Sequence, residues 1–183
     1  MLKNATNELK EIVQSDEFQA LKDIRGEGFF EDMLKFFDVK YVDRAEQIVK
    51  EQLLYKRHNM KIFDIGSGFG YFPWLCKRIG HDVICSDIHV DLYDRVREFL
   101  GLEGVRLRVV PLEKLQIEGK FDMISALKCS FHDMQGKKWG RKIWRHFYKE
   151  CVHHLNKKGM LYITSSGIMD VGGKRCDESL YIK

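Results

Sequence analysis

Several features that define other classes of protein are scarce or missing in these 183 residues. No apolar run approaches the roughly 20 residues that a membrane-spanning helix needs. The first eight residues lack the apolar core of a secretory signal peptide, so we expect a cytoplasmic protein. The five cysteines form no C-x-x-C pair, and their odd number argues against a disulfide framework.

Proline is also scarce: the chain holds two, and neither lies in the first 58 residues. Within that segment Ala45, Ile48 and Val49 follow the spacing of one apolar helix face. A chain of this length is most often a single domain. We therefore predict a helical N-terminal extension over residues 1–58 and a second part over residues 59–183, which together form one compact unit.

From residue 60 onward, short apolar runs alternate with helical patterns. The strand patterns lie at 61–65, 83–86, 105–110, 121–126 and 160–164, and the helical patterns lie at 71–79, 91–100 and 139–155. Such alternation is typical of a parallel sheet with helices on both faces. The predicted fold class is α/β, a Rossmann-like three-layer α/β/α arrangement with a mostly parallel sheet. The connection 111–120 is short for a parallel crossover, so we expect at most one helical turn in it.

The stretch 64–70, Asp-Ile-Gly-Ser-Gly-Phe-Gly, joins the first predicted strand to the first predicted helix. Glycine permits backbone angles that a side chain forbids, and a helix N-terminus offers unpaired N–H groups. Such a turn is typical of a nucleotide-binding element. Its spacing is G-x-G-x-G, whereas a dinucleotide fingerprint is G-x-G-x-x-G. A second acid, Asp87, ends the next predicted strand.

This arrangement of glycines and acids resembles the first two motifs of class I S-adenosylmethionine-dependent methyltransferases, and the resemblance extends from about residue 60 to 166. It implies S-adenosyl-L-methionine as the cofactor and S-adenosyl-L-homocysteine as the product. The residues it assigns to the cofactor are Asp64, Gly66, Ser67, Gly68, Gly70 and Asp87. Asp87 is expected to accept hydrogen bonds from the ribose hydroxyls. The Asp64 carboxylate either accommodates the sulfonium cation or only holds the shape of the turn.

The remaining cofactor contacts are expected along the same edge, because open α/β sheets bind ligands at the carboxyl ends of their strands. Ile88 is expected on the adenine face. The family often carries an acid after the third strand, where this chain has Pro111. We therefore expect the Leu112 N–H and Glu113 to contact adenine. Lys128 and Cys129, after the fourth predicted strand, are expected to line the pocket through their backbones.

Methyl transfer from a sulfonium is an in-line displacement that depends on holding the acceptor and the methyl group together. A base is needed only where the acceptor must lose a proton. His132 and Asp133 follow the fourth predicted strand and are the candidate catalytic residues. The alternative is that His132 packs under a helix and Asp133 caps a turn. Asp122, at the other end of the strand, is interpreted as structural.

The absence of two motifs reduces the number of plausible classes of methyl acceptor. Residues 127–130 lack the Asn/Asp-Pro-Pro-Tyr/Phe tetrad that many amino-methyltransferases of DNA, and some of RNA and protein, carry. The sequence also shows no metal-ligand spacing. The net charge of +4 is mild, and the basic run 137–142 is more typical of a solvated loop than of a phosphate site. We expect a small-molecule or glycan-like acceptor rather than nucleic acid.

Three alternatives remain open. The aromatic residues at 29–37 pack in the core or, as N-terminal helices often do in this family, cover the acceptor pocket. Residues 165–183 are too few for the helix and two strands with which the family ends, although 179–182 could add one strand. The edge near the fifth strand would then suit a second copy or another protein. The chain would in that case be a cofactor-binding but catalytically weak subunit of a larger assembly. The third alternative, a nicotinamide-dependent oxidoreductase, is opposed by the glycine spacing and Asp64.

Overall fold

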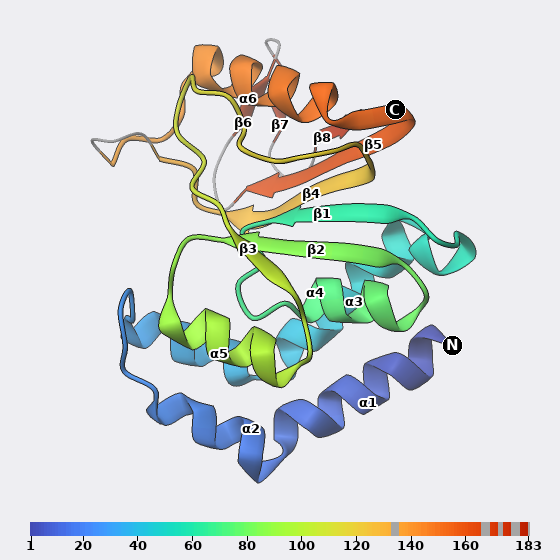
Figure 1. The fold of residues 1–183 in the computed structure, drawn as a ribbon, viewed down its shortest axis with the longest axis vertical. Coiled ribbons are helices and arrows are strands. Elements are labelled where there is room, and N and C mark those ends of the chain that lie inside the picture. The colour runs from blue at the N-terminus through green and yellow to red at the C-terminus, as the bar shows by residue number, and fades with distance from the viewer. Residues whose placement is uncertain (133–135, 166–168, 172–173, 177–179, 183) are drawn as a thin grey trace.

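The computed structural model describes residues 1–132, 136–165, 169–171, 174–176 and 180–182, with side chains for residues 1–132 and 136–164. A six-stranded sheet runs through its centre (Figure 1). Its strands are β1 (Lys61–Ile65), β2 (Asp82–Asp87), β3 (Gly104–Arg106), β4 (Phe121–Cys129), β5 (Leu155–Ser165) and β8 (Leu180–Ile182). A separate antiparallel pair is formed by β6 (Met169–Val171) and β7 (Lys174–Cys176).

The strand order is β3-β2-β1-β4-β5-β8, and the first five strands are parallel. The predicted Rossmann-like fold class with a mostly parallel sheet is therefore confirmed. β8 pairs antiparallel with β5, so the expected added strand near residues 179–182 is present and covers β5. The order of the strands reverses between β1 and β4, and such a switch point is where doubly wound sheets bind ligands at their carboxyl edge.

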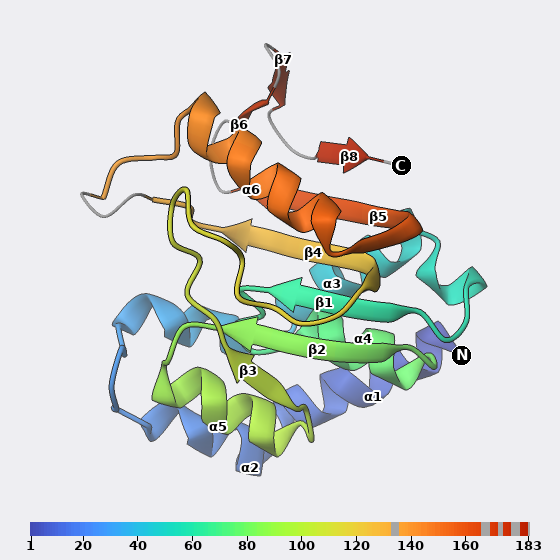
Figure 2. The same ribbon diagram turned by 45° about the horizontal axis from the view of Figure 1, so that its top comes forward.

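Helices lie on both faces of the sheet. They are α1 (Leu2–Gln14), α2 (Asp16–Ala20), α3 (Lys40–Glu51), α4 (Tyr71–Arg78), α5 (Asp91–Phe99) and α6 (Arg141–His153), with short 3-10 helices η1 (Leu21–Asp23), η2 (Glu31–Phe37) and η3 (Leu54–Lys56). Figures 1 and 2 show α1 to α5 on one side of the sheet and α6 on the other. In the described part of the chain no helix is long and apolar enough to cross a membrane.

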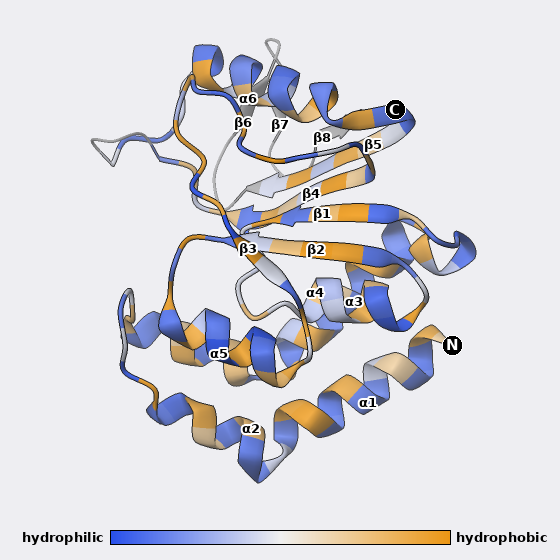
Figure 3. Ribbon diagram, in the orientation of Figure 1, coloured by the Kyte–Doolittle hydropathy of each residue, from blue (hydrophilic) through white to orange (hydrophobic). Residues whose placement is uncertain are grey.

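Each face of the sheet has its own hydrophobic cluster, because side chains alternate between the faces along a strand. Ile62 and Met123 pack with α1, α3 and α4 on the face that α1 to α5 cover, which we call the crowded face. Phe63 and Ile124 pack with Phe147 of α6 on the other face. The colours of Figure 3 follow this pattern: β1 and β2 are largely hydrophobic, whereas the helices show a hydrophobic and a hydrophilic side.

The connection between β3 and β4 takes the place of a second helix on the α6 face. Its residues Leu115 and Ile117 are buried there against the cluster of α6, and residues 107–120 form turns but no helix. The strand predicted over 105–110 ends earlier, at Arg106, because the chain leaves the sheet to cross toward α6. Its last tie to the sheet is the Leu107 N–H, which donates to the Asp87 carbonyl at 2.8 Å.

Several aromatic residues of the N-terminal segment pack in the core of the crowded face, whereas Phe30 is 59% exposed. Phe18 and Phe37 are buried, and the ring of Phe37 lies 4.9 Å from that of Phe69 in the glycine-rich loop. Within 29–37 this packing favours the core interpretation for Phe37, while the side chain of Phe30 stays outside the core. It also joins the segment 1–58 to the rest of the chain, while the domain boundary at residue 58 stays a prediction.

Candidate functional site

The glycine-rich loop between β1 and α4 is held in a conformation that its glycines make possible. Gly66, Gly68 and Gly70 have φ values of 70°, 52° and 81°. A Cβ on Gly66 would lie 2.4 Å from the Cys129 Sγ, so a side chain there has no room. A Cβ on Gly68 would meet nothing within 4 Å, so the loop is open to a ligand at this point.

The loop is tied to the end of β2. The backbone N–H groups of Gly66 and Ser67 both donate to the Ser86 carbonyl, at 2.8 and 2.9 Å. The Ser67 hydroxyl donates to the Asp64 carbonyl at 3.0 Å and accepts from the Ser86 N–H at 3.2 Å. Ser67 therefore shapes the loop through these bonds.

Asp87 closes the site at the tip of β2. Its Oδ2 accepts from the Gly68 N–H at 2.7 Å, and its Oδ1 accepts from the Ile88 N–H at 2.8 Å. Burial raises the pKa of Asp87 above its ordinary value, against the effect of these two bonds and of Arg97. Each carboxylate oxygen has a further lone pair with which it can accept from a ligand hydroxyl. Ile88 beside it is 51% exposed, so it is free to pack against a ligand.

Asp64 lies beneath the loop and is 2% exposed. Its Oδ1 accepts from the Ser125 hydroxyl at 2.6 Å, which joins β1 to β4. Burial raises the pKa of Asp64 to about 7, with a smaller contribution from the charge of Asp87, although bonds with Ser125 and Ser67 oppose the shift. This burial favours the loop-holding interpretation of Asp64.

One contributor to the site, Arg97, escaped the sequence analysis, and a second, Cys129, contributes its side chain where only its backbone was expected. Arg97 of α5 is 5% exposed, packs against Gly70, pairs with Asp94 and lowers the pKa values of Asp64 and Asp87. Cys129 packs against Gly66 with its Sγ 3.2 Å from the Ile65 carbonyl, and burial raises its thiol pKa. No local signal marked Arg97, because an arginine on a polar helix is ordinary in sequence, and position after a strand did not indicate that the Cys129 side chain would pack under the loop.

The region after the predicted end of the fourth strand differs from expectation, because β4 continues through Cys129. Lys128 lies inside the strand with φ 55°, and its N–H donates to the Thr164 Oγ1 at 2.8 Å. The His132 side chain is exposed, and its carbonyl accepts from the Trp139 indole N–H at 2.9 Å. Asp133 lies outside the described residues.

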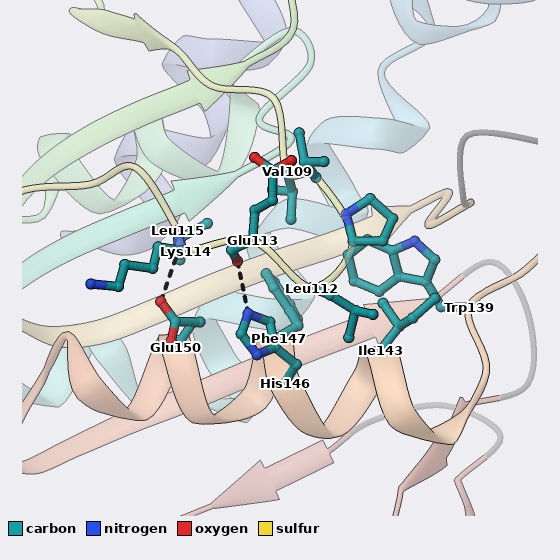
Figure 4. Close-up of a pocket in the computed structure, with 12 residues that line it drawn as sticks. Val109, Leu112, Glu113, Lys114, Leu115, Trp139, Ile143, His146, Phe147 and Glu150 are labelled. Atoms are coloured by element: carbon teal, nitrogen blue, oxygen red, sulfur yellow. Dashed lines mark hydrogen bonds between the residues drawn. The ribbon is translucent and has the colours of Figure 1, made fainter.

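Leu112 and Glu113 lie farther along the connection, against α6. Together with Trp139 and Ile143 they line a hollow of about 10 Å³ (Figure 4), roughly the room of one water molecule. The Glu113 carbonyl bonds the His146 Nε2 at 2.8 Å. An adenine ring does not fit this hollow, so any contact with adenine must come from the exposed side of Leu112 and Glu113.

The loop, Asp87 and Ile88 thus lie together, and Cys129 of β4 contacts the loop, whereas Lys128 and His132 make their hydrogen bonds to Thr164 and Trp139. The groups at the loop fit an adenosine ligand: the Asp87 carboxylate is a hydrogen-bond acceptor at the open turn of Gly68, and the exposed apolar side chain of Ile88 lies beside it. In the described parts of the chain no group of three His, Cys, Asp or Glu side chains is placed to hold a metal ion.

Solved structures share this fold at low sequence identity. PH0226 protein from Pyrococcus horikoshii OT3 aligns with a TM-score of 0.54 and 22% identity over 68% of this chain and 57% of its own. An S-adenosylmethionine-dependent methyltransferase from Clostridium acetobutylicum gives 0.55 and 16% over 74% and 55%. The glycopeptide N-methyltransferase MtfA, complexed with S-adenosyl-L-methionine, gives 0.51 and 12% over 77% and 65%.

The chain spans less than two thirds of the length of each of these three proteins. No curated protein matches its sequence. A sequence model of the methyltransferase small domain family matches residues 30–171, which is most of the chain. This match confirms the predicted relationship to class I S-adenosylmethionine-dependent methyltransferases and the predicted cofactor: the chain belongs to the methyltransferase small domain family.

Proposed function

We propose that this chain binds S-adenosyl-L-methionine at the Gly66–Gly70 loop and transfers its methyl group to a small-molecule or glycan-like acceptor. The observation that carries the proposal is the contact between the Asp87 Oδ2 and the Gly68 N–H, which fixes a carboxylate at the open point of the loop. A carboxylate in that place can accept both hydroxyls of a ribose.

The proposal gives each residue a role. When bound, the cofactor supplies an electrophilic methyl group on a sulfonium. Asp87 accepts from the ribose hydroxyls, Gly68 leaves room for the ligand, and Ile88 packs on the adenine. Leu112, Glu113 and the Lys128 carbonyl border the site. His132, with Asp133, takes a proton from the acceptor where the acceptor has one to lose.

The acceptor class rests on the sequence and on one similar structure. The tetrad of many amino-methyltransferases is absent from residues 127–130, and the net charge of the chain is only +4. A protein of similar fold is named as a glycopeptide N-methyltransferase. A small or glycan-like acceptor agrees with each of these observations.

Calorimetric titration of the full chain with S-adenosyl-L-methionine, S-adenosyl-L-homocysteine and NAD tests the cofactor assignment. The first two should bind and NAD should not. Asp87→Ala should weaken both by about 2 kcal/mol or more, the usual size of a charge-assisted contact. Asp82→Ala is the matched control, because Asp82 is exposed at the opposite end of the same strand. An equal loss of cofactor affinity in both variants would contradict the assignment of Asp87 to the cofactor site.

Turnover then separates the enzyme from its alternative. Formation of S-adenosyl-L-homocysteine with small amines, alcohols or glycans would support the enzyme. Tight cofactor binding without turnover on any of them would support a catalytically weak subunit. Light scattering of the purified chain tests for a homodimer, and fractionation of the source cells tests the cytoplasmic location.

A further inference from the structure

A second hollow lies at the amino edge of the sheet, away from the glycine-rich loop. It has a volume of about 670 Å³ and is lined by the segment after α3 and by the start of β5. Arg57 lies just before β1, and Met160 pairs with Met123 near the start of β4. The glycine-rich loop follows the opposite end of β1, so the two sites are separated by the length of the strands.

The rim of this hollow is positively charged. Arg57, Lys157 and Lys158 line it, all three are exposed, and within the described residues none of their side chains has a hydrogen-bond or ion-pair partner. The one carboxylate in the lining, Glu51, accepts from the Gln47 Nε2 at 2.7 Å. The three cations come from segments a hundred residues apart in the chain, and together they favour an anion.

A polar group without a partner also lines the hollow. Gln52 is 4% exposed, and its Oε1 is buried without a hydrogen-bond partner in the described structure. Buried polar atoms nearly always have a partner, so this oxygen would be stabilised by a ligand donor once the Gln52 side chain turns toward the hollow. Leu53 and Met160 add an apolar wall. Cations, an acceptor and an apolar wall in a hollow of this volume are the usual make-up of a small-molecule site.

We propose that this hollow binds a small phosphorylated molecule. Its phosphate contacts Arg57, Lys157 and Lys158, and a hydroxyl or amino donor of the same molecule contacts the Gln52 Oε1. A nucleic acid would make use of the cations, but it would leave the enclosed Gln52 unpartnered. The proposal is independent of methyl transfer, because none of these residues belongs to the cofactor site.

Calorimetry of the full chain at low salt, with S-adenosyl-L-homocysteine in excess, tests the proposal with ribose 5-phosphate, ribose and inorganic phosphate as probes. Ribose 5-phosphate should bind, and ribose should not. The double variant Lys157→Ala/Lys158→Ala should weaken ribose 5-phosphate about tenfold or more. Its matched control is Lys3→Ala/Lys149→Ala, which removes two exposed lysines from α1 and α6, neither with an ion-pair partner among the described residues, and should leave the affinity unchanged.

Gln52→Met tests the acceptor in the hollow separately. It should weaken ribose 5-phosphate several-fold more than inorganic phosphate, because in the proposed pose a sugar hydroxyl donates to Oε1 while the phosphate contacts the cations. Circular dichroism and thermal melting show whether each variant is folded. Absence of ribose 5-phosphate binding, or equal weakening in the two lysine double variants, would overturn the proposal. So would tight binding of a single-stranded RNA oligomer that needs Lys157 and Lys158 while ribose 5-phosphate fails to bind.

Discussion

The two edges of the sheet differ in the charged side chains of their candidate sites: the carboxyl edge holds one buried and one partly buried acid, whereas the hollow at the amino edge is lined by three exposed basic side chains. At the carboxyl edge the acids are held by the main chain: Asp87 accepts from two backbone N–H groups, and Asp64 is buried beneath the loop. At the amino edge Arg57, Lys157 and Lys158 are exposed and unpaired within the described residues. The carboxyl edge therefore has a fixed geometry before any ligand binds, whereas the amino edge offers charge on flexible side chains.

The directions of strands and helices explain this difference. In a parallel sheet the helix N-termini face the carboxyl edge, where their N–H groups favour acids. The C-terminus of α3 ends beside the amino edge, where its carbonyls favour cations. The predictions below alter one edge at a time, from the largest expected effect to the smallest.

Asp64→Asn should remove a large pH dependence of stability. In the unfolded chain the Asp64 carboxyl loses its proton near its ordinary pKa of 3.8, whereas in the folded chain it keeps the proton up to about pH 7. The free energy of unfolding should therefore fall as pH rises from about 4 through 7, by up to about 4 kcal/mol. The variant keeps an acceptor for Ser125 and should be more stable than the parent at pH 8.

Urea unfolding of parent and variant between pH 4.5 and 8 measures this effect. Asp82→Asn, which changes an exposed acid at the amino end of β2, is the control and should follow the parent. If the free energy of unfolding depended on pH in the same way for the parent and for Asp64→Asn, the raised pKa of the Asp64 carboxyl would be contradicted.

Gly66→Ala and Gly68→Ala should have different effects: the first should mainly lower stability, and the second should mainly weaken cofactor binding. The Gly66 variant meets the Cys129 Sγ and should lose about 3 kcal/mol of stability, from overpacking and positive φ combined. Gly68→Ala should lose only about 1 kcal/mol, from positive φ, and should weaken cofactor binding. Chemical denaturation and calorimetry measure the two quantities. The double variant Gly66→Ala/Cys129→Ala should recover part of the lost stability, and no recovery would contradict the clash.

Asp122→Ala should affect stability but not cofactor binding. At the amino edge the Asp122 Oδ2 accepts from the Lys61 N–H at 2.9 Å, and its Oδ1 accepts from the Asn156 Nδ2 at 2.7 Å. These bonds agree with the structural interpretation of this residue. Their loss should cost about 2 kcal/mol in urea unfolding. An altered affinity for S-adenosyl-L-homocysteine, with stability unchanged, would contradict this separation of the edges.

His89→Ala should have the smallest effect. The His89 ring contacts Asp94 at 3.0 Å, Asp91 at 3.3 Å and Glu27 at 3.5 Å, and so joins the N-terminal segment to the turn after β2. These groups are partly exposed, so the loss should be about 1 kcal/mol or less. Thermal melting measures it, with Arg78→Ala, which breaks a surface pair with Glu8, as the control. A loss of several kcal/mol would show that this junction is part of the core.

Much of the carboxyl edge could be predicted from the sequence because its signals are local. The glycine spacing, the alternation of strands and helices, and the acid at the tip of β2 each depend on neighbours along the chain. The ends of β3 and β4 were predicted less well. Whether the chain leaves the sheet at Arg106, or stays in it through Cys129, depends on partner strands and on the burial of Leu115 and Ile117.

The sequence by itself determined the fold class, the family and the loop that the cofactor assignment uses, since these follow from short-range patterns. Only the tertiary structure decided that Asp64 is buried, that Arg97 lies beside Gly70, and that Arg57 meets Lys157 and Lys158 around one hollow. The reason is physical: desolvation and charge proximity depend on which distant segments pack together, and periodicity along one segment holds no information about its partners.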